Sequence, residues 1–185
     1  MKIWLVRHAK PLVEKGLCYG RLDVKADQTL TELASDNLMN ALSERSGIKV
    51  LLTSPRRRTK QLANLLAQRL NINLVEEERL AEMDFGEWEG RTYDAIDAED
   101  GPRWRQWCEN WQTMAPPGGE ALDVFSARIV NWLETQTLTP NDAIVTHAGV
   151  IRTCRVLSGA SWEEAMASEN PFLGWTQHSL AALDQ

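Results

Sequence analysis

Short apolar runs alternate with longer amphipathic stretches along the chain. The runs at residues 3–6, 49–53, 73–75 and 142–146 have the length and composition of buried strands. Another stretch, residues 175–183, is predicted to add a strand at one edge of the sheet. We expect these strands to build a mainly parallel sheet, because parallel strands are buried on both faces and show little polar alternation.

Helical periodicity follows the first strand. One face of residues 30–45 collects the apolar side chains of this stretch, which are Leu30, Leu33, Ala34, Leu38, Ala41 and Leu42. Thr29 and Glu32 have the spacing of a capping box at its start, and Gly47 lies just beyond its end. We expect these residues to form a helix with this face buried.

Three further helices follow the later strands. Ser54 and Pro55 are predicted as the N-cap and first-turn residue of the second helix. Its apolar stripe continues through Leu62, Leu65, Leu66 and Leu70. The third helix is indicated by apolar residues on one side, which are Leu122, Phe125, Ile129, Trp132 and Leu133. The fourth is expected at residues 150–157, after a turn at Gly149.

The alternation of strands and helices predicts an α/β fold, a three-layer α/β/α sandwich around a mainly parallel sheet. Residues 76–117 interrupt the alternation, because they are acidic, rich in tryptophan and weakly periodic. We interpret them as a small helical lid in which Trp104, Trp107 and Trp111 pack together. The sequence contains no repeat or low-complexity linker, so residues 1–185 are expected to form one domain.

Composition limits the possible functions. Hydrophobic residues make up 43% and charged residues 25% of the chain, which argues against disorder. The net charge of −6 argues against a nucleic-acid binder, and no apolar run is long enough to cross a bilayer. The three cysteines contain no CxxC pair, so neither a disulfide scaffold nor a zinc site is expected. We expect a cytoplasmic protein with no membrane or nucleic-acid partner.

Polar side chains cluster where the predicted strands end. Arg7 and His8 follow the first strand, residues 54–58 follow the second, and His147 follows the strand at residues 142–146. Ligands of open parallel sheets bind at the carboxyl ends of the strands, so we expect these loops to share a site. The third histidine, His178, lacks this context and is expected to be structural.

An arginine triplet opens the second helix. Cations are unfavourable in the first turn, where the helix macrodipole is already positive, so at least one of the three is expected to face an anion. Arg58 is the best candidate among Arg56, Arg57 and Arg58, because Leu62 begins the buried stripe four residues later.

A carboxyl group near these cations would complete the chemistry by donating a proton. The acidic stretch after residue 75 offers Glu82, Asp84 and Glu87. Spacing alone does not choose among the three.

Two imidazoles, two guanidiniums and one carboxyl are suited to transfer of a phosphoryl group. His8 would attack phosphorus as a neutral nucleophile, and Arg7 and Arg58 would neutralise the phosphate oxygens. His147 would donate a further hydrogen bond to the phosphate. This chemistry requires neither a metal nor a cofactor, and the expected partner is a small-molecule phosphate monoester.

Several tracts resemble the histidine phosphatase superfamily, in its phosphoglycerate mutase-like branch. They are LVRHA (5–9), YGRLD (19–23), LTELA (30–34), TSPRRRTKQLA (53–63), LAEMDFGEWEG (80–90), PPGGEALDVFSAR (116–128) and VTHAGVIR (145–152). They occur in the order that the superfamily has them and span most of the chain. Such an ordered set is far more specific than the RHA triplet alone.

The resemblance implies a role for each candidate residue. It implies that His8 is the phosphorylated nucleophile and that Glu82 is the proton donor. It also implies that the phosphate is bound by Arg7, Arg58 and His147. It thereby favours Glu82 over the other two carboxylates. It also implies three substrate contacts, made by Tyr19, Gly20 and the backbone N–H of Ala148.

The tract at residues 7–24 is most similar to α-ribazole phosphatases, which implies α-ribazole 5′-phosphate as the substrate and a role in cobalamin biosynthesis. Two positions depart from the superfamily pattern, since Ala9 replaces the usual glycine and Glu14 a frequent asparagine. A positive φ at residue 9 would strain alanine, and loss of the asparagine weakens a mutase interpretation. The alternatives are a phosphoglycerate mutase-like or broad-specificity phosphatase and a non-catalytic phosphate-binding module.

Overall fold

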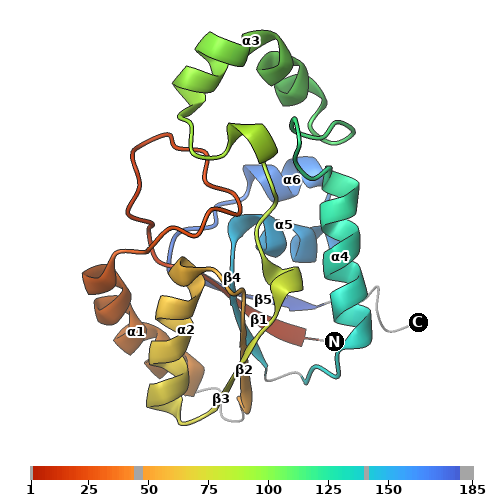
Figure 1. Ribbon diagram of the computed structural model, residues 1–185. Helices are drawn as coiled ribbons and strands as arrows, with labels where there is room; N and C mark the ends of the chain where they lie inside the picture. Colours follow the sequence, from red (N-terminus) through yellow and green to blue (C-terminus); the bar gives the residue numbers. More distant parts are fainter. Residues whose placement is uncertain (1, 44–47, 140–141, 180–185) are drawn as a thin grey trace.

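The computed structural model describes residues 2–43, 48–139 and 142–179 (Figure 1). Within these residues, five strands form one sheet in the order β3-β2-β4-β1-β5. The strands are β1 Lys2–Arg7, β2 Val50–Thr53, β3 Asn73–Glu76, β4 Ala143–Thr146 and β5 Trp175–Ser179. β1 to β4 pair in parallel, and β5 pairs antiparallel with β1 at the edge. The predicted strands are confirmed, and residues 180–183 of the expected edge strand lie outside the described residues.

Successive side chains of the strands point to opposite faces of the sheet, and both faces are buried. In β1, Ile3 and Leu5 join one apolar cluster, whereas Trp4 and Val6 join a second cluster on the other face. Each of these four side chains is at most 5% exposed. Burial on both faces explains why the strands are continuous apolar runs in the sequence.

Helices cover both faces of the sheet, as Figure 1 shows. α1 and α2 pack on the face of Trp4, whereas α4, α5 and α6 pack on the face of Ile3. The described helices are α1 Gln28–Ser43, α2 Arg57–Leu70, α3 Tyr93–Asn110, α4 Leu122–Thr135, α5 Ala148–Leu157 and α6 Trp162–Ala167, with short 3-10 helices η1 Glu78–Leu80 and η2 Gly86–Trp88. The predicted three-layer sandwich is thus confirmed. None of the described helices combines the length and the apolar character needed to cross a membrane.

The buried face of α1 differs from the prediction. Leu30 and Leu33 are 43% and 65% exposed, while Thr31 and Ser35 are fully buried. Both buried hydroxyls donate to backbone carbonyls one turn earlier in the helix, so their burial leaves no donor unsatisfied. These short side chains face α2, and the two helices pack closely along this face.

The starts of α1 and α2 also differ from the prediction. Asp27 caps α1, because its carboxylate accepts the backbone N–H three residues later at 3.0 Å, and Thr29 lies inside the helix. The predicted end at Arg45, with Gly47 beyond it, lies outside the described residues. α2 begins after Arg56, which makes no side-chain capping hydrogen bond.

The segment between β3 and α4 extends away from the sheet and contains α3 (Figure 1). Together with Cys18 from the loop after β1, this segment forms an apolar cluster in which Cys18, Trp88 and Ile96 are buried and Trp104 and Trp107 pack against them. The expected packing is confirmed for these two indole rings and is wrong for Trp111, which instead packs against Trp162 of α6, with ring centroids 6.2 Å apart. The role of the segment as a lid stays a prediction.

We predict that Leu33→Ala changes the free energy of unfolding by less than about 0.5 kcal/mol, because this side chain is exposed. Leu38→Ala on the same helix is expected to cost about 2–3 kcal/mol, because Leu38 is 3% exposed and packs in the core. Urea unfolding followed by circular dichroism measures both variants. Equal destabilisation by the two substitutions would contradict the observed orientation of α1.

Candidate active site

Two histidines meet at the carboxyl ends of β1 and β4. The strand register pairs Arg7 with Thr146, so His8 and His147 each follow a paired residue. The backbone N–H of His8 donates to the Thr146 carbonyl at 3.1 Å. The centroids of the two imidazole rings lie 5.2 Å apart, and both side chains are at most 1% exposed. The sheet therefore brings these two predicted site residues together.

Ser54 reaches the same place from β2. Thr53 is paired with Val145, so Ser54 lies at the same edge of the sheet. Its hydroxyl oxygen is 2.8 Å from Nε2 of His147, and its side chain is fully buried. The prediction of Ser54 as a helix cap is therefore wrong, and the residue instead orients a histidine. Its position directly after a buried strand is the same signal that selected His8.

His8 is held as a neutral ring with one nitrogen free. Its Nδ1 lies 2.6 Å from the Ala9 carbonyl oxygen, which can only accept a hydrogen bond, so Nδ1 carries the proton. Burial, together with the positive charges of Arg58 and Arg7, lowers the pKa of His8 to about 3. At neutral pH, Nε2 is therefore unprotonated and able to act as a nucleophile.

The two departures from the superfamily pattern have simple structural outcomes. Among the described residues other than glycine, a positive φ occurs at Asn71 and Leu173, so Ala9 is not strained. Ala9 is fully buried and provides the carbonyl that binds His8. Glu14 is exposed on the loop that follows.

Two arginines bring positive charge to this site and form no ion pair within the described part of the chain. Arg58 is fully buried and donates to the carbonyls of Gly20 and Leu22 at 2.5 and 2.6 Å. Arg7 donates to the carbonyl of Asn170. The Nε atoms of both arginines are buried and have no hydrogen-bond partner among the described residues. Because buried charges are stable when paired, this arrangement is suited to binding an anion.

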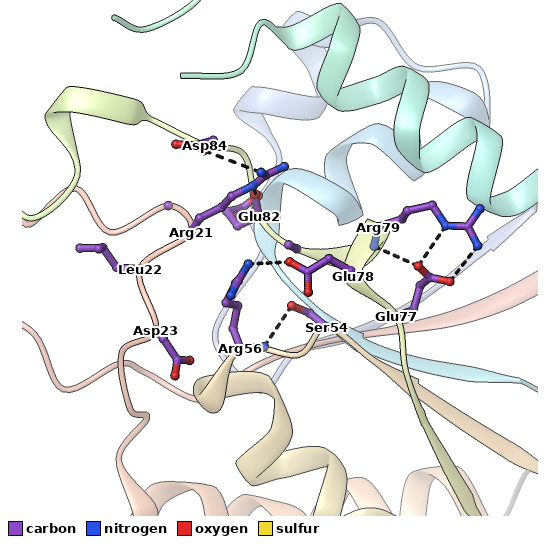
Figure 2. A network of polar contacts seen from close by, with 12 residues as sticks. Arg21, Leu22, Asp23, Ser54, Arg56, Glu77, Glu78, Arg79, Glu82 and Asp84 are labelled. Atoms are coloured by element: carbon purple, nitrogen blue, oxygen red, sulfur yellow. Dashed lines mark hydrogen bonds and ion pairs between the residues drawn. The ribbon is translucent and has the colours of Figure 1, made fainter. Parts of the chain in front are cut away.

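The other two members of the arginine triplet have different surroundings. Arg56 pairs with Glu78 at 2.7 Å, a contact visible in Figure 2, and Arg57 is exposed. Arg58 is thus the member that turns inward, on the side of α2 where Leu62 is buried.

The predicted substrate contacts, Tyr19, Gly20 and Ala148, lie around these charged groups. The guanidinium carbon of Arg58 is 5.1 Å from the centroid of the Tyr19 ring. Gly20 has a φ of +21°, and a Cβ there would lie 2.2 Å from a carboxylate oxygen of Glu89, so only glycine fits. Ala148 begins α5, and the free N–H groups of a helix N-terminus favour an anion.

Glu82 is the acidic residue that reaches α5. Its carboxylate accepts the backbone N–H of Gly149 at 3.2 Å and that of Met83 at 3.1 Å. A Cβ on Gly149 would lie 2.2 Å from Oε1 of Glu82, so glycine is needed for this approach. Asp84 and Glu87 instead pair with arginines away from α5.

The loop that carries Glu82 is held through its backbone. Arg128 on α4 donates to the carbonyls of Arg79, Ala81 and Glu82 at 2.6, 2.8 and 3.0 Å. Glu120, whose side chain is 8% exposed, pairs with Arg128 at 2.8 Å and fixes its guanidinium. We call Arg128 and Glu120 the carbonyl clamp.

A second arginine binds the same loop, as Figure 2 shows. Arg21 donates from Nε to the Glu82 carbonyl at 3.3 Å and pairs with Asp84 at 3.7 Å. It also pairs with Glu120 of the carbonyl clamp at 3.3 Å. Sequence reasoning missed Arg21, Glu120 and Arg128, because backbone carbonyls of distant segments leave no pattern in the sequence.

The carboxyl edge of the sheet thus combines one buried and one half-buried guanidinium, two imidazoles and one carboxyl group. This set of groups is suited to binding a phosphate-like anion and to phosphoryl transfer through a nucleophilic nitrogen. Within the described residues, no group of three or more His, Cys, Asp or Glu side chains is arranged to hold a metal ion.

Comparison with known proteins agrees with this class. The profile of the histidine phosphatase superfamily (branch 1) matches residues 3–177, and the chain belongs to this superfamily. It is 30% identical to "Putative phosphoserine phosphatase 2" of Hydrogenobacter thermophilus, over 81% of this chain and 74% of that protein. It is 29% identical to the adenosylcobalamin/alpha-ribazole phosphatase of Salmonella typhimurium, over 82% of this chain and 76% of the relative.

The fold is also similar to that of a solved phosphatase structure. The alpha-ribazole phosphatase from Shigella flexneri superposes with a TM-score of 0.82 and 26% identity, over 96% of this chain and 89% of that one. The chain is therefore a hydrolase of the phosphatase class, and its α/β fold is that of phosphoglycerate mutase-like proteins.

We predict that Arg128→Met lowers kcat about tenfold or more with little change in KM, because Glu82 loses its backbone support and is misplaced. Steady-state hydrolysis of 4-nitrophenyl phosphate measures both constants, and circular dichroism checks the fold. Arg103→Met serves as the control, since the Arg103 side chain is 52% exposed. A folded Arg128→Met protein with normal kcat would show that the carbonyl clamp does not position Glu82.

We also predict that the free energy of unfolding falls as the pH drops from about 6.5 towards 4. Burial lowers the pKa of His8 to about 3, of His178 to about 4 and of His147 well below its ordinary value. The unfolded chain takes up protons below about pH 6.5 while these folded rings stay neutral, so acid favours unfolding. Above that pH these groups leave stability unchanged.

His178 allows this linkage to be measured outside the site. His178→Gln is expected to remove about 1–2 kcal/mol of the stability lost between pH 7.5 and 5. Urea unfolding at the two pH values, on wild type and variant, gives the difference. The same loss in both proteins would mean that His178 is protonated in the folded state.

Proposed function

We propose that this protein is a phosphomonoesterase that hydrolyses a small phosphate monoester through a covalent phosphohistidine on His8. The observation that carries the proposal is the neutral His8 ring, whose free Nε2 lies in a site with His147 and two arginines that form no ion pair among the described residues. Membership of the histidine phosphatase superfamily supports the reaction class.

The proposed reaction has two displacements at phosphorus. In the first, Nε2 of His8 forms a bond to phosphorus, and the bond from phosphorus to the ester oxygen breaks. Glu82 in its acid form gives its proton to the leaving oxygen, so the alcohol departs neutral. In the second, Glu82 takes a proton from water, the resulting oxygen attacks phosphorus, and the phosphorus–nitrogen bond breaks to release inorganic phosphate.

Arg7, Arg58 and His147 bind the phosphoryl oxygens in this proposal. The transition state spreads negative charge over these oxygens, and guanidiniums already fixed in position stabilise that charge without reorganising. The backbone N–H of Ala148, at the start of α5, adds a donor. The hydrogen bond between Ser54 and His147 keeps the second imidazole in one orientation.

We propose α-ribazole 5′-phosphate as the substrate, which gives α-ribazole and phosphate as products in cobalamin biosynthesis. The support is the similarity to alpha-ribazole phosphatases in both sequence and fold. Tyr19 and Gly20 are the proposed substrate contacts on the loop after His8. Phosphoserine is the second candidate, because a relative of similar identity carries that name.

We predict that the chain forms an acid-labile phosphohistidine when it is mixed with ³²P-labelled α-ribazole 5′-phosphate and quenched within seconds. His8→Ala is expected to abolish both the label and phosphate release, because it removes the nitrogen proposed to attack phosphorus. The control is Arg57→Ala, which removes an exposed arginine of the same triplet.

Phosphate release from α-ribazole 5′-phosphate and from phosphoserine, measured side by side, tests the choice of substrate. Faster release from phosphoserine would overturn the choice and keep the mechanism. Undiminished turnover by His8→Ala would refute the mechanism. Phosphate binding without turnover in wild type would identify a binding module.

A further inference from the structure

A cavity of about 370 Å³ lies next to the proposed phosphate site. Tyr19 and Phe172 line it and also contact the charged groups. The Phe172 ring lies 4.0 Å from the guanidinium carbon of Arg7 and 5.6 Å from the His8 ring, between centroids. A leaving group attached to a phosphate on these residues would therefore extend past Phe172 into the cavity.

The cavity is also lined by the exposed end of a stack of aromatic rings. Tyr93, the first residue of α3, is 45% exposed and lies parallel to Trp104, with centroids 5.6 Å apart at 21°. Trp104 in turn stacks on Trp107 at 5.5 Å and 22°. The two indoles pack against the buried Trp88, so Tyr93 is the member of the stack that remains open to a ligand.

The position of Tyr93 is fixed relative to the loop after His8. Its backbone N–H donates to the carbonyl of Gly16 at 2.9 Å, and Leu17 forms a β-bridge with Thr92. Other residues of this loop, including Val13, complete the cavity wall. The stack and the loop therefore present one preformed surface, which limits the entropy lost on binding.

We propose that this cavity is a subsite for a flat aromatic ring in the leaving group, and that Tyr93 determines specificity by stacking on that ring. This inference rests on the proposed phosphatase function and names the substrate class of the same site. A ring joined to the phosphate through a sugar spans from Arg7 past Phe172 to Tyr93. The three-carbon leaving group of phosphoserine has no ring for Tyr93 to bind.

Two substrates that share the phosphorylated ribose, one with and one without the aromatic base, isolate this contact. α-Ribazole 5′-phosphate carries an aromatic base, and ribose 5-phosphate lacks it. We expect Tyr93→Leu to lower kcat/KM about tenfold for the first substrate and to leave the second unchanged, since stacking on an aromatic side chain is worth roughly this factor. Tyr93→Phe and Tyr93→Trp keep a flat ring and are expected to retain the preference.

A matched control tests the alternative path for the ring. A smaller cavity of about 120 Å³ is lined by Glu82 and by Met166, which is 44% exposed. Met166→Ala is expected to leave the ratio of the two kcat/KM values unchanged. A fall in that ratio for Met166→Ala, or equal losses on both substrates for Tyr93→Leu, would overturn the assignment of the ring to Tyr93.

Binding of α-ribazole, which has no phosphate, separates this inference from the proposed function. Equilibrium dialysis should show weaker binding to Tyr93→Leu than to wild type, whether or not the enzyme turns over. Ring binding that depends on Tyr93 without any hydrolysis would refute the function and keep the subsite. Hydrolysis that is equal on both substrates and insensitive to Tyr93 would refute the subsite and keep the function.

Discussion

The candidate site depends on one constraint, the parallel register of three adjacent strands. Pairing of Arg7 with Thr146, and of Thr53 with Val145, carries His8, His147 and the residue after β2 to one edge of the sheet. A slip by one residue would turn every side chain of a strand to the opposite face. It would exchange the two apolar clusters and separate the histidines at once. The burial that stabilises the fold therefore also sets the distance between the imidazole rings.

Backbone carbonyls, rather than carboxylates, hold the charged groups around this edge. Arg58 binds the carbonyls of residues 20 and 22, Arg7 binds that of residue 170, and Arg128 binds three carbonyls in the loop of Glu82. A carbonyl orients a guanidinium without neutralising it, so Arg7 and Arg58 keep their charge for an incoming anion. Arg128 instead forms an ion pair with Glu120, so its role is to position the loop of Glu82. The two kinds of arginine are thus distinguished by their partners.

Sequence periodicity predicted the strands, the outer helices α1, α2, α4 and α5, and the residues at the strand ends, but it missed the short helix α6. These predictions succeeded where the spacing of nearby residues in the sequence indicates which side of an element is buried. Leu62, for example, lies four residues after Arg58 and marks the buried side of the helix. The prediction failed for α1, where Thr31 and Ser35 satisfy their own hydroxyls and displace two leucines from the core. The carbonyl clamp was also missed, because a carbonyl has the same chemistry at every residue.

β1 has β4 and β5 as its neighbours in the sheet, although α1 to α4 lie between them in the chain. During translation, His8 leaves the ribosome long before His147 and before the segment at Asn170 that covers Arg7. Contacts between such distant segments form late, after the intervening layers have collapsed. A nascent polypeptide therefore exposes His8, the proposed nucleophile, before the surrounding site has formed, and the site is complete only once β5 has been synthesised.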